Sequence, residues 1–271
     1  MKTDSKNNAN EAGGGLEKYP RPSVAVDVVL FTMDREDPKN YRKLPDMHLE
    51  VLLIKRGIEP FRGSWALPGG FVRPDETLEV AAARELEEET GNPGRYLEQL
   101  FTFSELGRDP RTWVLSCAHM ALVPKHSTHL NAGDDAADAA WFRVNLEAEK
   151  DDRYHLVLSG RDEVLKATVR MCAGEPELIE NDGLAFDHAK IIAYAVERLR
   201  SKLDHTDIAL NLMPAAFTLT ELQRIYESIL GRKLLSAAFR RKVAGLVEGV
   251  EEYVENAGHR PSQLFRRRDD Q

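Results

Sequence analysis

The sequence contains no apolar run of the roughly 18 residues that a membrane-spanning helix needs, so we expect no transmembrane segment. Its polar, glycine-rich start, MKTDSKNNANEAGGGLEKYPRP, has no apolar core of the kind that secretory signal peptides carry. We therefore expect a cytoplasmic protein that does not bind membranes. Because residues 1–21 hold so little apolar surface to bury, we expect them to form a disordered tail.

Cysteine is scarce as well, with only Cys117 and Cys172 in the chain. Neither belongs to a CxxC pair or to a cluster with histidine, which argues against a structural zinc site. Both stand among apolar residues, as buried free cysteines usually do. We therefore expect two buried, reduced thiols, as is common in the cytosol.

The formal net charge of −8 argues against nucleic-acid binding by the whole surface. The basic residues are nevertheless concentrated near the C-terminus. Between residues 232 and 245 the chain has several lysines and arginines and no acidic residue, and more arginines follow. These basic residues are Arg232, Lys233, Arg240, Arg241, Lys242, Arg260, Arg266, Arg267 and Arg268.

The first two thirds of the chain alternate between strand and helix patterns. Stretches of apolar, often β-branched residues predict strands at 24–33, 48–56, 96–105, 112–124 and 139–144, with two more within 154–171. Residues 77–90 are rich in alanine, leucine and glutamate and predict a helix that Gly91 ends. A second helix is predicted at about 187–203. This order predicts an α+β fold.

The C-terminal part has a different pattern. Residues 217–231, FTLTELQRIYESILG, have apolar side chains at intervals of three and four, as an amphipathic helix does. Thr218 and Glu221 have the spacing of a capping box. A short basic helix, a pair of strands and a turn between them are predicted to follow, and this order is typical of a winged helix-turn-helix. We place the domain boundary near 211–217, which divides the chain into residues 22–210 and 211–271.

Three glutamates in the helix at 77–90 suggest a metal-binding catalytic site. Glu85, Glu88 and Glu89 stand at positions i, i+3 and i+4, so their carboxylates share one helical face. Like charges so placed repel each other by a few tenths of a kcal/mol, roughly, for each pair. Hard cations such as Mg²⁺ prefer clustered carboxylate oxygens, and a metal so held can activate water. The alternative is an acidic helix face that only contacts solvent.

The residues around these glutamates resemble the Nudix box, the signature of hydrolases that cleave nucleoside diphosphates linked to another moiety. Eight positions match it, and Asn92 departs from it where the family usually has an aliphatic residue. The matching residues are Gly70, Glu76, Arg84, Glu85, Leu86, Glu88, Glu89 and Gly91.

This resemblance implies an α/β/α sandwich around a mixed sheet. It makes Glu85, Glu88 and Glu89 the Mg²⁺ ligands, of which Glu88 and Glu89 would be catalytic if the protein is an active enzyme. It also implies a structural salt bridge between Glu76 and Arg84, beside the Gly70 backbone. The motif does not identify a general base.

The basic C-terminal helix and hairpin resemble the recognition helix and the wing of a winged helix-turn-helix. In such domains the second helix enters the major groove, where arginines read guanine edges, and the wing contacts the backbone. The alternative is again a solvated helix face. The candidate DNA contacts are Arg240, Arg241 and Lys242 on the helix, with Arg260, Arg266 and Arg267 on the hairpin.

A Nudix box followed by LAFDHAKIIAYAVERLRSKL, FTLTELQRIYESILGRKL and FRRKV resembles the Nudix-related transcriptional regulators, NrtR. The resemblance implies a homodimer that binds a palindromic operator through residues 211–271 and represses genes of NAD synthesis and salvage. It implies that residues 22–210 bind ADP-ribose, which releases the DNA. The segment LGRDPR, residues 106–111, is also characteristic of these sequences. The candidate ligand-binding residues are Arg62, Arg108 and Arg111; the alternatives for the segment are a dimer contact and a simple charged loop.

Several alternatives remain open at this point. A sister group of these regulators senses sugars instead. All acidic positions of the Nudix box are kept, so a Mg²⁺-dependent ADP-ribose pyrophosphatase is the main alternative. A purely structural interaction module would require both the box and the basic helix to be accidents.

Overall fold

The computed structural model of the chain describes residues 19–36, 45–91, 94, 96–128, 136–254 and 261–268. Three earlier expectations concern residues outside these ranges. They are the disorder of residues 1–18, the DNA contact at Arg260 and the departure from the Nudix box at Asn92.

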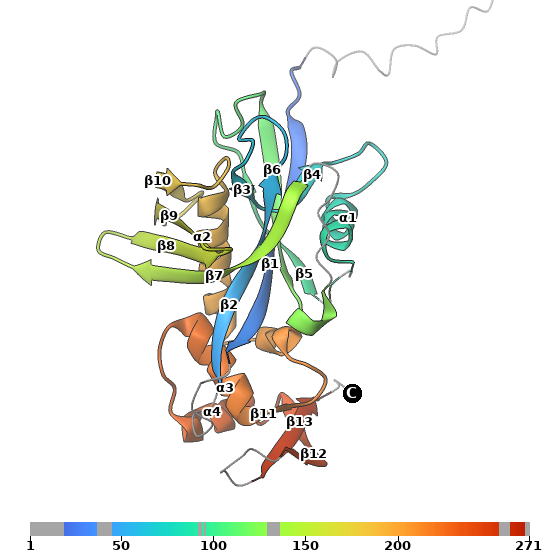
Figure 1. Ribbon diagram of the computed structural model, residues 1–271, viewed down its shortest axis with the longest axis vertical. Coiled ribbons are helices and arrows are strands. Elements are labelled where there is room, and N and C mark those ends of the chain that lie inside the picture. The colour runs from blue at the N-terminus through green and yellow to red at the C-terminus, as the bar shows by residue number, and fades with distance from the viewer. Residues whose placement is uncertain are drawn as a thin grey trace, which may run out of the picture.

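Most strands join one large mixed sheet (Figure 1) with the order β10-β9-β8-β7-β2-β1-β6-β5. β1 runs parallel to β6 and antiparallel to β2, and the other neighbouring strands are antiparallel. The predicted strands are all confirmed. Their bounds are β1 (Ser23–Glu36), β2 (Asp46–Arg56), β5 (Tyr96–Phe103), β6 (Val114–Leu122), β7 (Ala136–Ala148), β8 (Arg153–Gly160) and β9 (Glu163–Arg170).

The sheet also contains three strands that the sequence did not predict. β3 (Trp65–Ala66) and β4 (Gly69–Phe71) are too short to show an alternating pattern. β10 (Glu177–Asp182) is longer but has no buried residue, because it lies at the edge of the sheet. Pairing defines these strands: β3 pairs with β2, β4 with β1 and β10 with β9.

The expectation of two buried cysteines is wrong for one of them. Cys117 is buried in β6, as expected, whereas Cys172 is exposed. Cys172 stands two residues after the end of β9, where the chain leaves the sheet for the turn to the edge strand β10. Its apolar neighbours in the sequence, Met171 and Ala173, also lie outside the strand, so the apolar sequence around it does not place it in the core.

Helices cover both faces of the sheet, which confirms the predicted α/β/α sandwich (Figure 1). Side chains of β1 alternate between two cores. Val28 and Leu30 belong to the core under the first helix, and Val29 and Phe31 to the core under the second. The helices predicted at 77–90 and 187–203 are α1 (Leu78–Thr90) and α2 (His188–Lys202).

The ends of α1 follow from two residues that the sequence shows. The Thr77 hydroxyl accepts a hydrogen bond from the Val80 amide at 3.3 Å, which satisfies a backbone donor at the helix start. Gly91 ends the helix with a left-handed φ of 63°, a conformation that costs glycine little. These ends fix where the three glutamates of the box lie on the helix.

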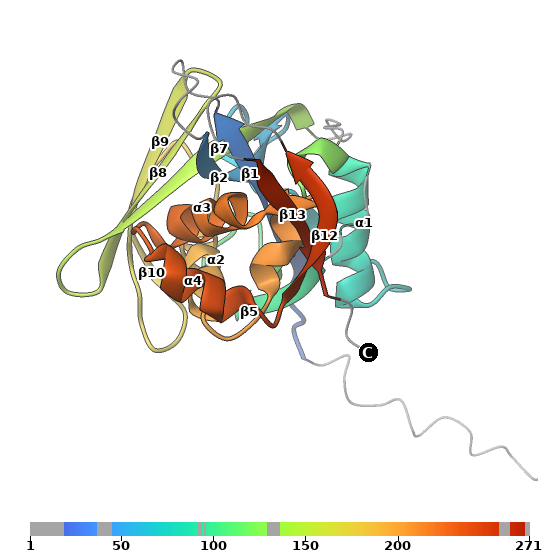
Figure 2. The same ribbon diagram turned by 90° about the horizontal axis from the view of Figure 1, so that it is seen from below.

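The C-terminal part forms the predicted winged helix-turn-helix below the sheet, nearest the viewer in Figure 2. The capping box of Thr218 and Glu221 is confirmed. The sequence did not predict the third strand, β11, or the short 3-10 helix η3 before it. The elements are η3 (Ile208–Leu212), β11 (Phe217–Thr218), α3 (Leu219–Leu230), α4 (Ser236–Val243), β12 (Val247–Val254) and β13 (Ser262–Arg267).

The winged helix packs directly against the large sheet through α3 and β2. The Arg224 guanidinium lies 3.3 Å from the Asp46 carboxylate, and that of Arg35 lies 3.3 Å from Glu221. The two parts of the chain therefore have a defined relative position. Over the residues that the structure describes, no helix has the length and apolar character that crossing a membrane requires.

Candidate functional site

Arg84 is the centre of the Nudix box. Its guanidinium donates to Glu76 through Nε at 3.1 Å and Nη2 at 2.8 Å, which is the salt bridge that the resemblance implies. Glu76 also accepts from the Arg73 amide at 2.9 Å. The hydrogen bonds from Arg84 and Arg73 lower the pKa of the Glu76 carboxyl from 4.5 to about 2. Glu76 therefore joins the loop before α1 to the helix itself.

Arg84 also contacts two of the three glutamates on the acidic face. Its Nη1 lies 2.6 Å from Glu85 and 3.5 Å from Glu88. Glu85 and Glu89 are buried, whereas the Glu88 side chain is 50% exposed. Burial raises the pKa of Glu85, and the hydrogen bond from Arg84 opposes this. Arg84 thus offsets part of the repulsion among the carboxylates.

Gly70 lies directly over Glu85. A Cβ atom at position 70 would stand 2.3 Å from Glu85 Oε1, so only glycine fits here without moving the carboxylate. The glycine of the box therefore has a physical reason: it brings the β4 backbone against the acidic face of α1.

The predicted metal ligands fit Mg²⁺ in their chemistry but not in their present arrangement. Carboxylate oxygens suit this ion. However, Arg84 contacts Glu85 and Glu88, and within the described ranges no three His, Cys, Asp or Glu side chains are grouped so as to hold a metal. Metal binding by Glu85, Glu88 and Glu89 remains a prediction, and we derive no reaction step from it.

A cavity of about 130 Å³ lies beside the box, on the other side of Gly70. Two of the three candidate ligand-binding residues, Arg108 and Arg111, line it, while Arg62 is exposed and outside its lining. Gly70 of the box lines it too, whereas the sequence did not single out several of the other lining residues. Among them are Asp27, Arg56, Phe71, Phe186 and His188.

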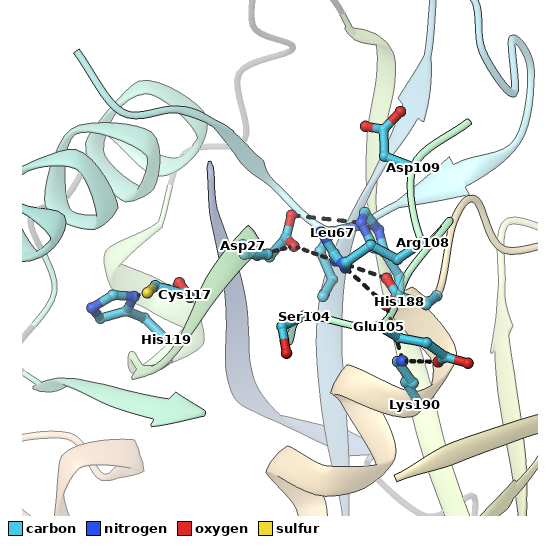
Figure 3. Close-up of polar contacts among 12 residues, drawn as sticks. Asp27, Leu67, Ser104, Glu105, Arg108, Asp109, Cys117, His119, His188 and Lys190 are labelled. Carbon is cyan, nitrogen blue, oxygen red and sulfur yellow. Dashed lines mark hydrogen bonds and ion pairs between the residues drawn. The ribbon is translucent and has the colours of Figure 1, made fainter. Parts of the chain in front are cut away.

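The Arg108 side chain is only 6% exposed and holds the loop at 104–111 in place (Figure 3). It contacts the Asp187 carboxylate at 2.8 and 3.0 Å and Asp27 at 3.4 Å. Although burial opposes its charged form, these carboxylates keep the pKa of Arg108 above its ordinary value. Because two carboxylates already pair with Arg108, its main role at the cavity is to fix the position of the loop at 104–111.

Arg111 is the more accessible arginine, with 41% of its side chain exposed. It pairs with Asp109 at 2.7 Å. Its guanidinium also lies over two aromatic rings, 5.4 Å from the centre of Phe71 and 5.7 Å from that of Phe186. An exposed guanidinium among aromatic rings can take part both in pairing with an anion and in stacking.

His188 connects the cavity to the start of α2. Its Nδ1 accepts a hydrogen bond from the Leu67 amide at 2.8 Å, so Nε2 carries the proton and lies 3.5 Å from Asp27 Oδ1 (Figure 3). Burial lowers the pKa of His188, which favours the neutral ring. The signal in the sequence is Asp187, His188 and Lys190, three polar residues next to the apolar stretch IIAYAV of the helix.

The candidate DNA contacts differ in their surroundings. Arg240 and Arg241 are exposed on α4. Lys242, Arg266 and Arg267 each form an ion pair within the protein. Their partners are Asp204, Glu248 and Asp207, respectively.

Comparison with known proteins gives two family matches. Residues 22–158 match the NUDIX domain, and residues 209–267 match the NrtR DNA-binding winged helix domain.

Individual relatives agree with this arrangement. The chain is 34% identical over 252 residues to an ADPR-responsive transcriptional repressor, NtrR, of Acinetobacter baylyi, covering 92% of this chain and 83% of that protein. It is 40% identical over 127 residues to the ADP-ribose pyrophosphatase of Methanocaldococcus jannaschii, covering 47% of this chain and 65% of that protein. The crystal structure of Shewanella oneidensis NrtR complexed with a 27mer DNA matches with a TM-score of 0.65 and 28% identity, covering 90% of this chain and 93% of that one. Because the similarity extends over nearly the whole chain, with both domains in the same order, this chain belongs to the NrtR family of Nudix-related transcriptional regulators.

Proposed function

We propose that this chain is a DNA-binding transcriptional repressor of NAD biosynthesis and salvage genes, and that ADP-ribose bound to its Nudix domain releases the DNA. The observation that carries the proposal is the 34% identity, over 92% of the chain, to a relative named as an ADPR-responsive repressor. The proposed domains are residues 22–210 for ligand sensing and 211–271 for DNA binding.

The cavity has the chemistry that such an effector requires. ADP-ribose offers a diphosphate and an adenine ring. Arg111 can pair with phosphate oxygens, and Phe71 and Phe186 offer ring faces beside it. The cavity opens toward exposed residues, so it need not enclose the whole ligand. The rest would lie along the exposed Phe71 and Arg111.

The winged helix supports the DNA half of the proposal. Arg240 and Arg241 are exposed on α4, the helix that corresponds to a recognition helix. We propose that the protein acts as a homodimer, because two winged helices would then read the two halves of a palindromic operator. A gel shift tests this half: the protein should bind DNA from upstream of its regulated genes in preference to random DNA. Equal binding to both would contradict it.

The alternative function is a Mg²⁺-dependent ADP-ribose pyrophosphatase. Two observations favour it: all acidic positions of the box are present, and the M. jannaschii enzyme is 40% identical over the region that the chain shares with it. Incubation with Mg²⁺ and ADP-ribose, followed by analysis for AMP and ribose 5-phosphate, tests it. Turnover that disappears in Glu88→Gln and Glu89→Gln would support the alternative, and no turnover by the wild type would reject it.

A regulator that senses a sugar is the remaining possibility within the family resemblance. Calorimetric titration of the chain with ADP-ribose and with a free pentose separates the two. Arg111→Ala should weaken ADP-ribose binding, because it removes the accessible cation, while Arg62→Ala, outside the cavity, is the matched control. If the chain binds the pentose but not ADP-ribose, ADP-ribose is rejected as the effector.

A further inference from the structure

α2 connects the cavity to the winged helix. At its start, His188 lines the cavity, and Asp187, directly before the helix, pairs with Arg108. Near its end, Arg200 donates to the Ile229 carbonyl at 2.8 Å, on the last turn of α3, and to the Leu146 carbonyl at 2.9 Å, on β7. One rigid element therefore contacts the ligand side, the sheet and the helix-turn-helix.

The turn that follows α2, residues 203–207, is fixed to the end of the helix. The amides of His205 and Thr206 both donate to the Lys202 carbonyl, at 3.1 and 3.0 Å. This turn carries two carboxylates, Asp204 and Asp207. We call residues 203–207 the acidic turn.

Both carboxylates of the acidic turn are paired with cations of the winged helix. Asp204 lies 2.7 Å from Lys242 on α4, and Asp207 pairs with Arg267 on β13. Arg267 also donates to the Asn211 side chain at 3.3 Å. The acidic turn thus contacts the proposed recognition helix and the wing at the same time.

We propose that the acidic turn competes with DNA phosphates for Lys242 and Arg267, and that a ligand in the cavity weakens DNA binding through this turn. The proposal rests on the proposed repressor function. A lysine or arginine that contacts a carboxylate must leave it before it can neutralise a phosphate. Because the acidic turn is attached to α2, the position of this helix can determine whether Lys242 and Arg267 pair with the turn or with DNA phosphates.

The strength of these pairs suits an exchangeable contact. In the first pair Asp204 is 56% and Lys242 33% exposed, and in the second Arg267 is 48% and Asp207 35% exposed. Ion pairs that solvent reaches in this way are weak and screened by salt. The hydrogen bond from Lys242 lowers the pKa of Asp204, so this carboxylate is charged at neutral pH. DNA, with a dense row of phosphates, can displace such partners.

Removing the two carboxylates tests the competition. In the full-length protein, Asp204→Asn combined with Asp207→Asn should bind a labelled random-sequence duplex about three- to ten-fold more tightly than the wild type, since each exposed pair contributes up to about a factor of five. Thermal unfolding of both proteins checks that the variant is folded. Unchanged or weaker DNA binding by the folded double variant would overturn the proposal. Absence of wild-type binding to DNA from upstream of its regulated genes would instead overturn the repressor function itself.

A matched control separates this effect from the general loss of negative charge. Asp162→Asn removes one charge in the exposed β8–β9 turn and is compared with Asp204→Asn alone, which also removes one. This turn lies at a different part of the sheet from the acidic turn. Arg161, next to Asp162, contacts Asp138 near the start of β7, whereas Arg200, near the acidic turn, contacts Leu146, eight residues further along that strand. We expect this control to change DNA affinity less than about two-fold, because charges beyond a Debye length of about 10 Å are largely screened. An equal gain in the control would overturn the specific role of the acidic turn.

Two further arms complete the test. When Lys242→Gln is added, Asp204→Asn should no longer increase DNA affinity, because the cation that Asp204→Asn frees is then absent. ADP-ribose should also weaken DNA binding by a smaller factor in the double variant than in the wild type, since the proposed route for release is missing. An equal factor in both proteins would overturn the part of the proposal that connects the ligand to this turn.

Discussion

Arg108 and Asp187 form a buried ion pair in which two guanidinium nitrogens lie 2.8 and 3.0 Å from the two carboxylate oxygens. Their side chains are only 6% and 8% exposed. The pair joins the loop at 104–111, which lines the cavity, to the residue directly before α2. Together with the ion pair between Glu105 and Lys190 at 2.7 Å, it holds the loop against the start of α2, the helix that leads to the winged helix.

Breaking this pair should destabilise the protein strongly. Asp187→Asn leaves Arg108 with only the more distant Asp27 carboxylate, and removing one partner of a buried ion pair costs about 3–5 kcal/mol. Urea denaturation should show a loss of free energy of unfolding of about that size. Glu177→Gln, which breaks the exposed pair with Arg170, is the control and should cost at most about 1 kcal/mol. Equal losses would contradict the central role of the buried pair.

The capping box at the start of α3 should contribute measurably to the stability of the winged helix. The Thr218 hydroxyl accepts from the Glu221 amide at 3.2 Å, and the Glu221 carboxylate accepts from the Thr218 amide at 2.8 Å. Thr218→Ala should lower the free energy of unfolding by about 1 kcal/mol. Thr220→Ala, one residue inside the helix, removes no cap and should cost less. Chemical denaturation of the two variants decides between these outcomes.

Local signals in the sequence explain why most elements were predictable. The apolar, β-branched run in β1, the cap at Thr77 and the left-handed glycine at Gly91 act over a few residues and determine the structure directly. The same holds for the capping box of α3. The Nudix resemblance also located Glu76 and Arg84, because both belong to one short motif.

The cavity was harder to predict, since its residues come from distant parts of the chain. Asp27 lies on β1, Phe186 precedes α2 and Arg56 ends β2, and only the folded sheet brings them together. The pairing of Lys242 with Asp204 was missed for the same reason, because 38 residues separate them. A basic run indicates DNA binding but does not show which of its cations the protein itself neutralises.

The pair of Glu76 and Arg84 should make stability depend on pH in acid. The pKa of Glu76 is lowered from 4.5 to about 2, so its contribution is complete above pH 4.5 and is lost as the pH falls toward 2. Glu76→Gln should therefore be less stable than the wild type at neutral pH, and the difference should shrink below pH 4.5. Arg84→Met, which removes the main cause of the lowered pKa, should lose the same pH-dependent part. Stability profiles of wild type and Glu76→Gln that remain parallel down to pH 2 would contradict this account.

The exposed arginines of α4 should determine the salt dependence of DNA binding. If Arg240 or Arg241 contacts a phosphate, its replacement by glutamine should reduce the slope of log K against log salt by about 0.9. A base contact would instead change the preference for one sequence by about 1–3 kcal/mol. Lys166→Gln, exposed on β9, is the control and should leave the slope unchanged. Slopes equal to the wild type and unchanged sequence preference in both arginine variants would remove α4 from the DNA contact.

The most direct test of the account is a titration of upstream DNA with the full-length protein, with and without saturating ADP-ribose. The account predicts preferential binding of this DNA over random DNA, and a reduction in affinity of about five-fold or more when ADP-ribose is present, as typical coupling between two sites gives. Binding that is equally tight with and without ADP-ribose, or equal for both DNAs, would contradict it.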